Sequence, residues 1–499
     1  MVWRTDTLFV LSPIEVSSAV QHRDSAPAAP RFRLLIGGRL HHGASSSDVI
    51  NPATGRAFAL APRADASQLD EAVAAAKAAF ATWSRTTLAE RRERLLDVAS
   101  SLERRSEEFS RLLTQEQGKT LGEARFEVGA SVAIMRALAE LDLPDRMLRD
   151  TPIERIVQQR VPLGVVAAIT PWNFPLFLLA IKLAPALLAG NTLVVKPAPT
   201  TPLTTLLLGE LCVDATPAGV VNVIADNNDL GSALTGHPDV AKVAFTGSTH
   251  TGRRVMANAA TGLKRLTLEL GGNDAAIVLA DARVDDLAPR IFQAAMLNAG
   301  QVCLAIKRLY VHDSIYEDMC RVLASLADAV VVGDGLDERS QMGPLQNQAQ
   351  YDKVKGYLED AHTRGVVIAG GKALDRSGYF VAPTIVRDIP DDARLVREEQ
   401  FGPLLPVLRY SDVADAIRRA NASDYGLGGT VWGTDLDQAY AVASQLEAGT
   451  VWINKHLDLP ADIPFGGLKQ SGLGFEMGRE GLEEFTQTRV VNMSKALGA

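Results

Sequence analysis

Residues 164–279 decide the fold of this 499-residue chain, because six short valine-rich runs alternate there with helical stretches. The runs are GVVAAI from Gly164, NTLVVK from Asn191, VVNVI from Val220, KVAFTG from Lys242, LTLEL from Leu266 and AAIVL from Ala275. Most of the intervals between them leave room for a crossover helix. The pattern predicts a parallel α/β sheet of the doubly wound type, with a ligand site at the carboxyl ends of its strands.

The segments on either side of this region extend the prediction. Apolar residues at helical spacing predict an amphipathic helix from Ser67, its expected cap, to Trp83, and a second from Leu88 to about Glu116, stopped by Gly118. After residue 285 the alternation returns more loosely, and strands are predicted at 308–311, 366–369, 404–408 and 450–453. We interpret this part as a second α/β domain.

Composition narrows the class of protein. The chain is 47% hydrophobic, and its 59 acidic and 51 basic residues are interspersed, giving a net charge of −8. Nucleic-acid and anionic-membrane binding are therefore disfavoured. Cys212, Cys303 and Cys320 form no CxxC pair, and the eight histidines form no HExxH motif, so neither a disulfide framework nor a metal site is expected. Free thiols favour a cytoplasmic location.

No apolar run reaches the roughly 18 residues of a membrane span, and the run near Phe177 is broken by Lys182 and Pro185. The first thirty residues lack a signal-peptide core and end in the linker-like APAAP at 26–30. We interpret residues 1–30 as a flexible extension.

Two motifs point to chemistry: RLTLELGGN at 265–273, and GQVC, which ends at Cys303. A carboxylate at the end of an apolar strand, here Glu269, has a pKa raised by desolvation and can act as a base. A cysteine in a Gly-Gln loop can act as a nucleophile. Taken singly, most cysteines pack in cores and most glutamates are solvated. Together the two motifs favour covalent catalysis through a thioester.

Other motifs accompany these two in a fixed order: TPWNFP from Thr170, VVKPAP from Val194, FTGSTHTG from Phe245, EEQFGP from Glu398 and PFGGLKQSG from Pro464. In order and spacing they resemble the aldehyde dehydrogenase superfamily, over roughly residues 33–496. The resemblance implies a Rossmann-type doubly wound cofactor domain, a second α/β catalytic domain and a small oligomerisation arm. The corresponding ranges are 31–147 with 161–270, then 271–474, and 148–160 with 475–499. A homodimer or homotetramer is implied.

The resemblance also implies a reaction. Cys303 would attack an aldehyde, with the Asn173 amide and the Cys303 backbone N–H stabilising the oxyanion. Hydride loss leaves a thioester that water, activated by Glu269, hydrolyses; members that acylate coenzyme A generally lack this glutamate. Lys182 and Glu476 resemble residues that assist proton movement. From local sequence alone, Asn173 is equally a turn residue, Lys182 a helix-surface residue and Glu476 a partner of Arg479.

For the cofactor, the resemblance places Ser248 at the phosphates, Lys196 at the adenosine ribose, Glu399 at the nicotinamide ribose and Phe401 near the nicotinamide. The full predicted set is Thr170, Pro171, Trp172, Lys196, Pro199, Gly231, Phe245, Thr246, Gly247, Ser248, Gly252, Glu269, Leu270, Gly271, Glu399 and Phe401. Pro199 stands where many NAD-preferring members carry a glutamate that repels a 2′-phosphate. We therefore expect NAD to work, and NADP to be accepted more readily than by a typical member.

By the same resemblance, the residues that would contact the aldehyde are Leu178, Ile181, Val302, Leu304, His456 and Phe465. The aliphatic members of this set favour a small aliphatic or aromatic aldehyde. Lys455 and His456, as cations, keep an acid semialdehyde of the succinate-semialdehyde type as the alternative, whereas betaine aldehyde is disfavoured because no aromatic box is visible. A binding or structural protein without turnover is a third interpretation. It is disfavoured because Cys303, Glu269 and Asn173 are all present.

Overall fold

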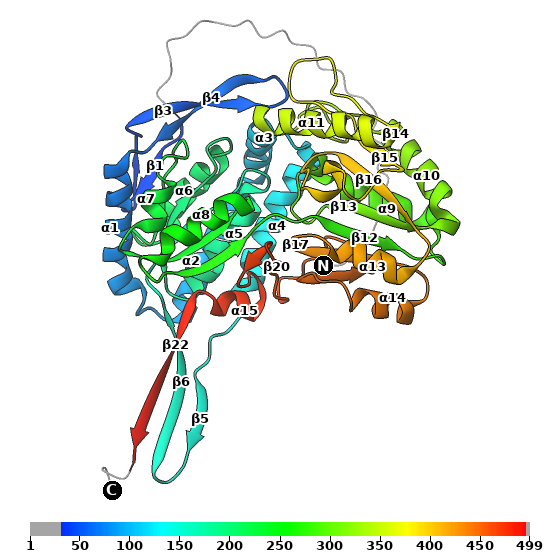
Figure 1. The fold of residues 1–499 in the computed structure, drawn as a ribbon. Helices are drawn as coiled ribbons and strands as arrows, with labels where there is room; N and C mark the ends of the chain where they lie inside the picture. Colours follow the sequence, from blue (N-terminus) through cyan, green and yellow to red (C-terminus); the bar gives the residue numbers. More distant parts are fainter. Residues whose placement is uncertain (1–30, 496–499) are drawn as a thin grey trace, which may run out of the picture.

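The computed structural model of the protein describes residues 31–495. Two α/β bodies lie side by side, and a narrow three-stranded arm projects from beneath the first of them (Figure 1). The extension predicted for residues 1–30 lies outside the described residues, as do residues 496–499.

The first body is built on an eight-stranded sheet whose five central strands are parallel. In sheet order the strands are β2 (Arg39–His41), β1 (Leu34–Ile36), β9 (Val221–Val223), β8 (Thr192–Lys196), β7 (Val165–Ile169), β10 (Val240–Thr246), β11 (Arg265–Glu269) and β21 (Gly472–Leu473). Every residue of β7 and β8 is buried. Such strands need helices on both faces, as a doubly wound sheet provides.

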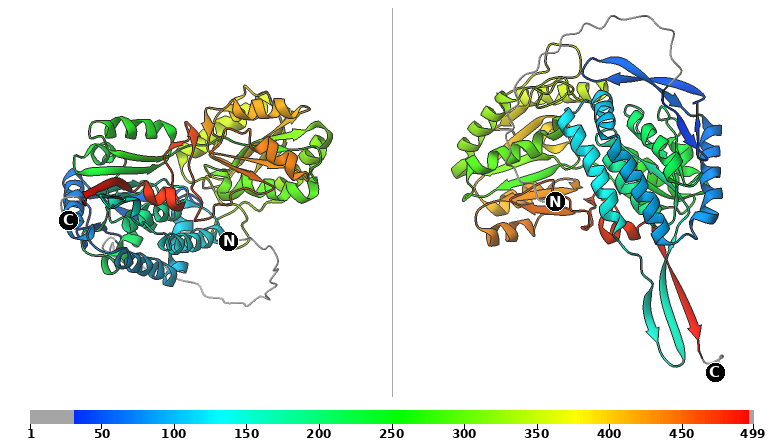
Figure 2. Two further views of the ribbon diagram at one scale, coloured as in Figure 1. Left: turned by 90° about the horizontal axis from the view of Figure 1, so that it is seen from below. Right: turned by 180° about the vertical axis from the view of Figure 1, so that it is seen from behind.

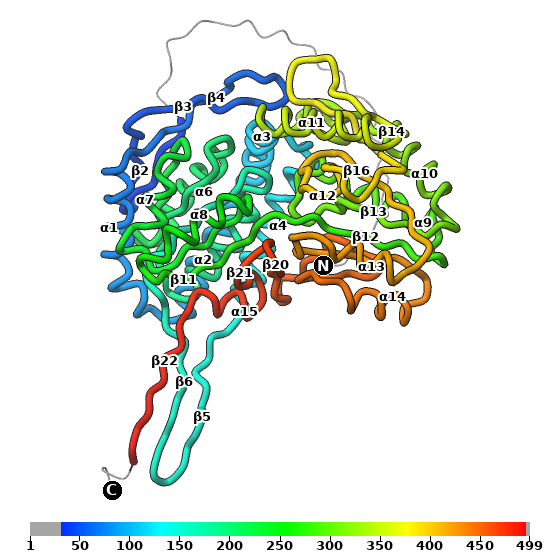
Figure 3. The backbone as a smooth tube through the Cα atoms, in the orientation of Figure 1, coloured from blue at the N-terminus to red at the C-terminus, as the bar shows by residue number. Residues whose placement is uncertain are grey.

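Five of the six valine-rich runs form those parallel strands, but the sixth does not. The run from Ala275 lies in β12 (Asp274–Val278), which pairs with β13 (Ile306–His312) in the second sheet. The prediction of a single sheet was therefore wrong for this run. Hydrophobic pattern identifies a buried parallel strand but not its neighbours, and the chain crosses from one body to the other between β11 and β12 (Figure 3).

Eight helices of the described chain accompany the first sheet: α1 (Ala66–Trp83), α2 (Leu88–Arg104), α3 (Ser106–Gln117), α4 (Leu121–Ala139), α5 (Pro175–Leu188), α6 (Leu203–Ala215), α7 (Gly231–Gly236) and α8 (Thr249–Ala260). Two sequence predictions needed correction. Asp65, not Ser67, caps α1, because its extended backbone lets the carboxylate accept from Gln68 N. The helix predicted from Leu88 is two helices, because Arg105 leaves the helical conformation (φ −106°, ψ 18°) while the apolar spacing continues.

The second body holds a seven-stranded sheet, parallel except at one edge. Its order is β14 (Val366–Ala369), β15 (Thr384–Arg387), β16 (Leu404–Tyr410), β13, β12, β18 (Gly428–Trp432) and β19 (Thr450–Ile453). The strands predicted at 308–311, 366–369, 404–408 and 450–453 are confirmed. Its helices are α9 (Val284–Met296), α10 (Tyr316–Ala329), α11 (Gln348–Arg364), α12 (Arg394–Arg397), α13 (Val413–Asn421) and α14 (Leu436–Ala443), with the 3-10 turns η1 (Leu297–Gly300) and η2 (Asp313–Ile315).

The arm joins β5 (Arg146–Asp150) and β6 (Glu154–Pro162) to β22 (Thr486–Ser494). Within the ranges implied for the oligomerisation arm, 148–160 and 475–499, the structure has β5, most of β6, and β22, and β6 pairs with β22 antiparallel over nine residues. Figure 1 and the right view of Figure 2 show the arm standing clear of both bodies. Val490, Val491 and Met493 on β22 are exposed apolar side chains.

Short elements complete the fold: the hairpin of β3 (Ser45–Asn51) and β4 (Arg56–Arg63), the pair β17 (Tyr425–Gly426) and β20 (Leu468–Lys469), and α15 (Gly478–Glu483) at the base of the arm. The β3–β4 hairpin reaches the second body, where Tyr379 N donates to Pro52 O. Within residues 31–495, no helix combines the length and apolar character that crossing a membrane requires.

Candidate active site

The carboxyl ends of four neighbouring parallel strands bring most of the predicted site together. Lys196 ends β8, Thr246 ends β10 and Glu269 ends β11, and Thr170 follows β7 directly. Sheet register aligns these ends, since Ile169 pairs with Lys196 and Thr246 pairs with Glu269. Parallel strands thus place residues that are distant in sequence along one edge.

Cys303 lies in a tight loop between η1 and β13 and is half-buried. Three consecutive residues before it, Asn298, Ala299 and Gly300, have left-handed φ values of 52°, 55° and 71°. Such a backbone is costly for Asn298 and Ala299 and favours glycine at 300. A side chain at 300 would also collide with the carbonyl of Gly402. Packing from the second body therefore holds the cysteine loop in a strained shape.

The glutamate motif and the cysteine loop are in direct contact. A Cβ atom placed on Gly272 would lie 2.6 Å from Cys303 O, so only glycine permits this approach. Lys307 Nζ donates to Cys303 O at 2.6 Å and to Val302 O at 2.9 Å, which fixes the loop from the other side. The two motifs that the sequence linked by chemistry are thus adjacent in space.

Burial raises the pKa of the Cys303 thiol to about 12; the charge of Lys307 acts in the opposite direction, and Glu269, Asp274 and Glu399 add to the rise. The resting group is therefore a thiol, and nucleophilic attack requires a base or an added positive charge. Cys212 and Cys320 are buried packing residues, and burial raises their thiol pKa values to about 12 and about 11. This agrees with the packing role inferred for both from the sequence.

Asn173 is a buried site residue rather than a simple turn. It is 4% exposed, and its Nδ2 donates to Gln301 O at 3.0 Å, two residues before Cys303. The backbone carbonyl of Asn173 accepts hydrogen bonds from Asn298 Nδ2 at 3.1 Å and from Lys119 Nζ at 2.9 Å. The amide predicted to stabilise the oxyanion is thereby tied to the cysteine loop, with its second N–H left for a ligand.

Lys119 is a residue that sequence reasoning missed. It is fully buried, its Nζ lies 2.5 Å from Glu127 Oε2, and it stands 3.6 Å over the Phe174 ring. Glu127 Oε1 accepts from Leu176 N at 2.9 Å, at the start of α5. The buried ion pair therefore anchors both ends of the turn that carries Asn173. The only sequence signal was a lysine between a helix stop, Gly118, and a capping threonine, Thr120.

Replacing Lys119 with methionine is expected to lower kcat by about tenfold to a hundredfold, because loss of one partner of a buried pair costs several kcal/mol and frees the Asn173 turn. The KM for the aldehyde should change less than kcat, and Lys119→Arg should recover part of the rate. Steady-state kinetics with a thermal unfolding check measure this. Lys264→Met is the control, since Lys264 also makes two hydrogen bonds, to the carbonyls of His237 and Val240, at the opposite end of β10. A folded Lys119→Met with wild-type kcat would refute a positioning role.

Glu269 is 4% exposed, and its pKa is raised well above the usual value, chiefly by burial and then by the charge of Glu476. Lys182 acts in the opposite direction. Oε1 of Glu269 has no hydrogen-bond partner among the described residues, which leaves it available to a water molecule. These are the properties of a general base held in a dry site.

Lys182 and Glu476 form a fully buried ion pair beside Glu269. Lys182 Nζ also donates to Thr246 Oγ1 at 2.6 Å, and Thr246 is the sheet partner of Glu269. The alternatives left open by the sequence are therefore resolved: Lys182 is not on the helix surface, and Glu476 pairs with Lys182. The β-bridge between Phe465 and Glu476 fixes the backbone at Glu476.

Several of the predicted cofactor residues lie at the carboxyl ends of the parallel strands of the first sheet, where a dinucleotide would bind. Ser248 is exposed and caps α8, accepting from Thr251 N at 3.3 Å, and the first turn of α8 carries no acidic residue. Such a helix start suits a pyrophosphate. The hydroxyl of Thr170 is buried without a hydrogen-bond partner in the part of the chain that the structure describes. Gly252 lies against Leu270, and Gly231 opens α7 with free space where a side chain would stand.

Trp172, Phe401 and Glu399, predicted for the nicotinamide end of the cofactor, lie near one another and near the Gly271–Gly272 turn. The Trp172 and Phe401 rings meet edge to face with centroids 5.3 Å apart, and Phe401 has a left-handed φ of 52°. A bulky residue in this conformation is a strained feature typical of ligand sites. Glu399 Oε1 accepts from Gly272 N at 2.9 Å, and Gly271 packs against the same carboxylate. Pro171 is half-buried beside Trp172. The residues present thus fit a nicotinamide dinucleotide.

The predicted substrate residues divide into two groups. Ile181, Val302, Leu304 and Phe465 are buried, whereas Leu178 is half-buried. Leu178 and Cys303 are both among the partly buried residues that pack against the hydrophobic core of the first body.

The expectation that His456 is a cation was wrong. Its Nε2 donates to Leu304 O at 2.5 Å, its ring packs edge-on against Trp452, and burial lowers its pKa to about 4. It is therefore neutral at pH 7. Lys455 is exposed and paired with Asp458. The sequence could not show the burial of His456, because it follows from packing against β19.

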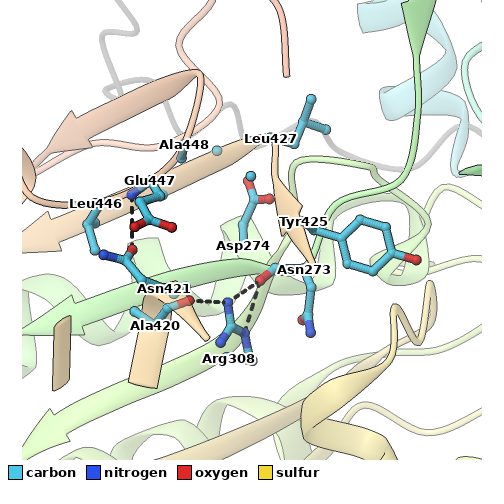
Figure 4. A pocket seen from close by; sticks show the side chains of 14 residues that line it. Asn273, Asp274, Arg308, Ala420, Asn421, Tyr425, Leu427, Leu446, Glu447 and Ala448 are labelled. Atoms are coloured by element: carbon cyan, nitrogen blue, oxygen red, sulfur yellow. Dashed lines mark hydrogen bonds between the residues drawn. The ribbon is translucent and has the colours of Figure 1, made fainter. Parts of the chain in front are cut away.

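A small cavity of about 20 Å³ lies behind the glutamate motif, lined by residues that include Asn273, Asp274, Arg308 and Tyr425 (Figure 4). Arg308 donates to Asn273 O through Nε and Nη2, at 3.0 and 2.7 Å. Burial raises the Asp274 pKa to about 7, opposed by the charges of Lys307 and Arg308. The space suits about one water molecule, not an aldehyde, so this cavity supports the turn. Within residues 31–495 no three His, Cys, Asp or Glu are grouped to hold a metal ion.

Comparisons with known proteins agree with this geometry. The profile of the aldehyde dehydrogenase family matches residues 41–491. Phenylacetaldehyde dehydrogenase of Pseudomonas fluorescens is 41% identical over 490 residues, covering 93% of this chain and 97% of the relative. Succinate-semialdehyde dehydrogenase (NADP(+)) of Escherichia coli K12 is 38% identical over 450 residues, covering 89% and 93%. A crystal structure of betaine aldehyde dehydrogenase from Staphylococcus aureus with NAD+ has a TM-score of 0.90 at 33% identity, covering 93% and 95%.

The chain therefore belongs to the aldehyde dehydrogenase family, as the motifs of the sequence indicated. It is an aldehyde dehydrogenase of the oxidoreductase class EC 1.2.1, with an NAD-binding fold.

Proposed function

We propose that this enzyme oxidises a small aliphatic or aromatic aldehyde to its carboxylic acid through a thioester on Cys303. The observation that carries the proposal is the contact between the Gly272 turn and the Cys303 loop, which sets the buried base Glu269 beside the nucleophile. Asn173 Nδ2 and the Cys303 backbone N–H are the oxyanion donors, held through Gln301. A nicotinamide dinucleotide, when bound at the carboxyl edge of the first sheet, would supply the acceptor for the hydride of the thiohemiacetal carbon.

Other residues of this chain are assigned to hydrolysis of the thioester, to proton transfer and to cofactor binding. Glu269 takes a proton from the water that attacks the thioester, and the acid leaves as Cys303 is freed. The buried pair of Lys182 and Glu476, which reaches Thr246, the sheet partner of Glu269, is the group that we assign to receive that proton. Glu399 and Phe401 orient the nicotinamide end, Ser248 and α8 take the phosphates, and Lys196 takes the adenosine ribose.

Two observations support an uncharged aldehyde. Cys303 packs, partly buried, against the apolar core of the first body, and neither His456 nor Lys455 supplies an unpaired cation. The relative that is 41% identical acts, by its name, on phenylacetaldehyde. An acid semialdehyde stays the second candidate, because a relative 38% identical is a succinate-semialdehyde dehydrogenase. Cytoplasmic location is part of the proposal, since all three cysteines are free.

The test is a panel of aliphatic, aromatic and acid-semialdehyde substrates, followed by formation of reduced NAD in the absence of coenzyme A. We expect kcat/KM for phenylacetaldehyde or a medium aliphatic aldehyde to exceed that for succinate semialdehyde by about tenfold or more, because an unpaired buried carboxylate is costly. The reverse order would favour the semialdehyde candidate. Absence of turnover across the panel would contradict both.

We also propose that the arm joins copies of the chain into a homodimer or homotetramer. Among residues 31–495, the outer edges of β5 and β22 have no strand partner, and β22 exposes Val490, Val491 and Met493. An exposed apolar strand edge needs a partner. Sedimentation equilibrium of the full chain distinguishes the two assemblies from a monomer.

A further inference from the structure

A buried carboxylate stands beside the lysine assigned to the adenosine ribose. Asp226 Oδ1 lies 2.7 Å from Lys196 Nζ, and the two side chains are 0% and 4% exposed. Asp226 follows β9, the neighbour of β8 in the sheet, with Val223 paired to Val195. Both residues therefore lie at the carboxyl edge of the first sheet, where the cofactor is proposed to bind. Sequence reasoning missed Asp226, which appears only as an acid two residues after a valine-rich run.

The position of Asp226 is fixed by two contacts. While Oδ1 faces Lys196, Oδ2 accepts from Leu230 N at 2.9 Å. Lys196 has a further, longer contact to Asn228 Oδ1 at 3.5 Å. The charge of Lys196 is therefore already matched by a carboxylate that cannot easily rotate away, and it is not free to receive a phosphate.

The surrounding loop adds no compensating cation. Residues 225–230, ADNNDL, contain two aspartates and neither lysine nor arginine. The second aspartate, Asp229, is exposed and pairs with Arg63. Pro199, three residues after Lys196, is half-buried and offers no carboxylate.

We propose that Asp226 sets cofactor preference, taking over from a different strand the role of the carboxylate that Pro199 lacks, so that the enzyme prefers NAD to NADP. The inference rests on the proposed role of Lys196 at the adenosine ribose. Because Asp226 is fully buried, it acts through Lys196: it neutralises the cation that a 2′-phosphate would need and adds a like charge behind it, while Lys196 can still donate to an uncharged ribose hydroxyl. Asp226 thereby reverses the expectation from Pro199 that NADP is accepted more readily than usual.

The test measures binding rather than turnover: fluorescence titration of NADH and NADPH into wild type, Asp226→Asn and Asp229→Asn. Wild type should bind NADH at least about tenfold tighter than NADPH, since like charges placed together cost several kcal/mol. Asp226→Asn should narrow this ratio by about tenfold, mainly through tighter NADPH binding. Asp229→Asn removes the same charge from the same loop but not from Lys196, and it should leave the ratio within about twofold of wild type.

If Asp226→Asn folds poorly, the wild-type ratio of affinities still tests the proposal; if it folds, a second substitution extends the test. The wild-type ratio needs no variant, and equal affinity for NADH and NADPH would overturn the proposal. Adding Pro199→Glu to Asp226→Asn should restore the preference for NADH, because a carboxylate returns to the ribose from the other loop. An unchanged ratio in a folded Asp226→Asn would also overturn it. Failure of the aldehyde panel with normal nucleotide binding would count against the proposed function alone.

Discussion

Replacing Cys303 with alanine is expected to abolish aldehyde oxidation, lowering kcat by about 10⁴-fold or more, as loss of a nucleophile does in covalent catalysis. The sulfur forms the bond on which both hydride loss and hydrolysis depend, so no neighbouring group can replace it. Cys303 is the half-buried cysteine, at the contact between the two bodies, whereas Cys212 and Cys320 are buried in helices. Initial rates of reduced-cofactor formation measure the effect.

The matched controls are Cys212→Ala and Cys320→Ala. Each removes one thiol and should keep kcat within about twofold while lowering stability slightly, because a small cavity forms. NADH titration into Cys303→Ala should give a dissociation constant close to that of wild type, which would show that the cofactor site is intact. A Cys303→Ala enzyme that retains a hundredth of the activity, or a silent Cys320→Ala, would contradict the assignment.

Replacing Glu269 with glutamine is expected to separate the two halves of the reaction. The thioester should form, giving a burst of about one reduced cofactor per active site, and steady turnover should then fall by about 10²- to 10⁴-fold, the range of general-base catalysis. Stopped-flow absorbance follows both phases. Hydroxylamine, a nucleophile that needs no base, should restore turnover of the stalled thioester. Loss of the burst itself would show that Glu269 is needed before the thioester.

The pH profile gives an independent measurement of the same base. Burial and the charge of Glu476 raise the pKa of Glu269 well above its usual value of 4.5, and only the ionised form accepts a proton. The hydrolysis rate of wild type should therefore rise with pH through this raised pKa and fall below it. Glu269→Gln should lose this limb of the profile. Glu484→Gln, a half-exposed carboxylate near Lys242, should keep it.

Sequence reasoning succeeded where the signal was local. Valine-rich runs identified five parallel strands of the first sheet, and the turns after them located Lys196, Ser248 and Glu269 at one edge. It failed where strand partners had to be chosen, as for the run in β12. A hydrophobic run reports that a strand is buried on both faces, and many partners satisfy that condition equally.

The sequence also could not predict contacts between site residues and partners that are far away along the chain. Lys119 reaches Asn173 across 54 positions, and Lys182 reaches Glu476 across 294. No spacing rule links such pairs, since only the packing of the finished fold brings them together. The same packing buried His456 and removed the cation that its residue type had suggested.

By itself, then, the sequence determined the family, the reacting pair Cys303 and Glu269 and the doubly wound character of the first sheet, because short-range patterns encode strands, turns and nucleophile loops. Only the tertiary structure decided which charges face one another: Lys119 with Glu127, Lys182 with Glu476 and Lys196 with Asp226. The physical reason is that a buried charge takes its properties from its partner and its desolvation, and both are created by contacts between distant segments.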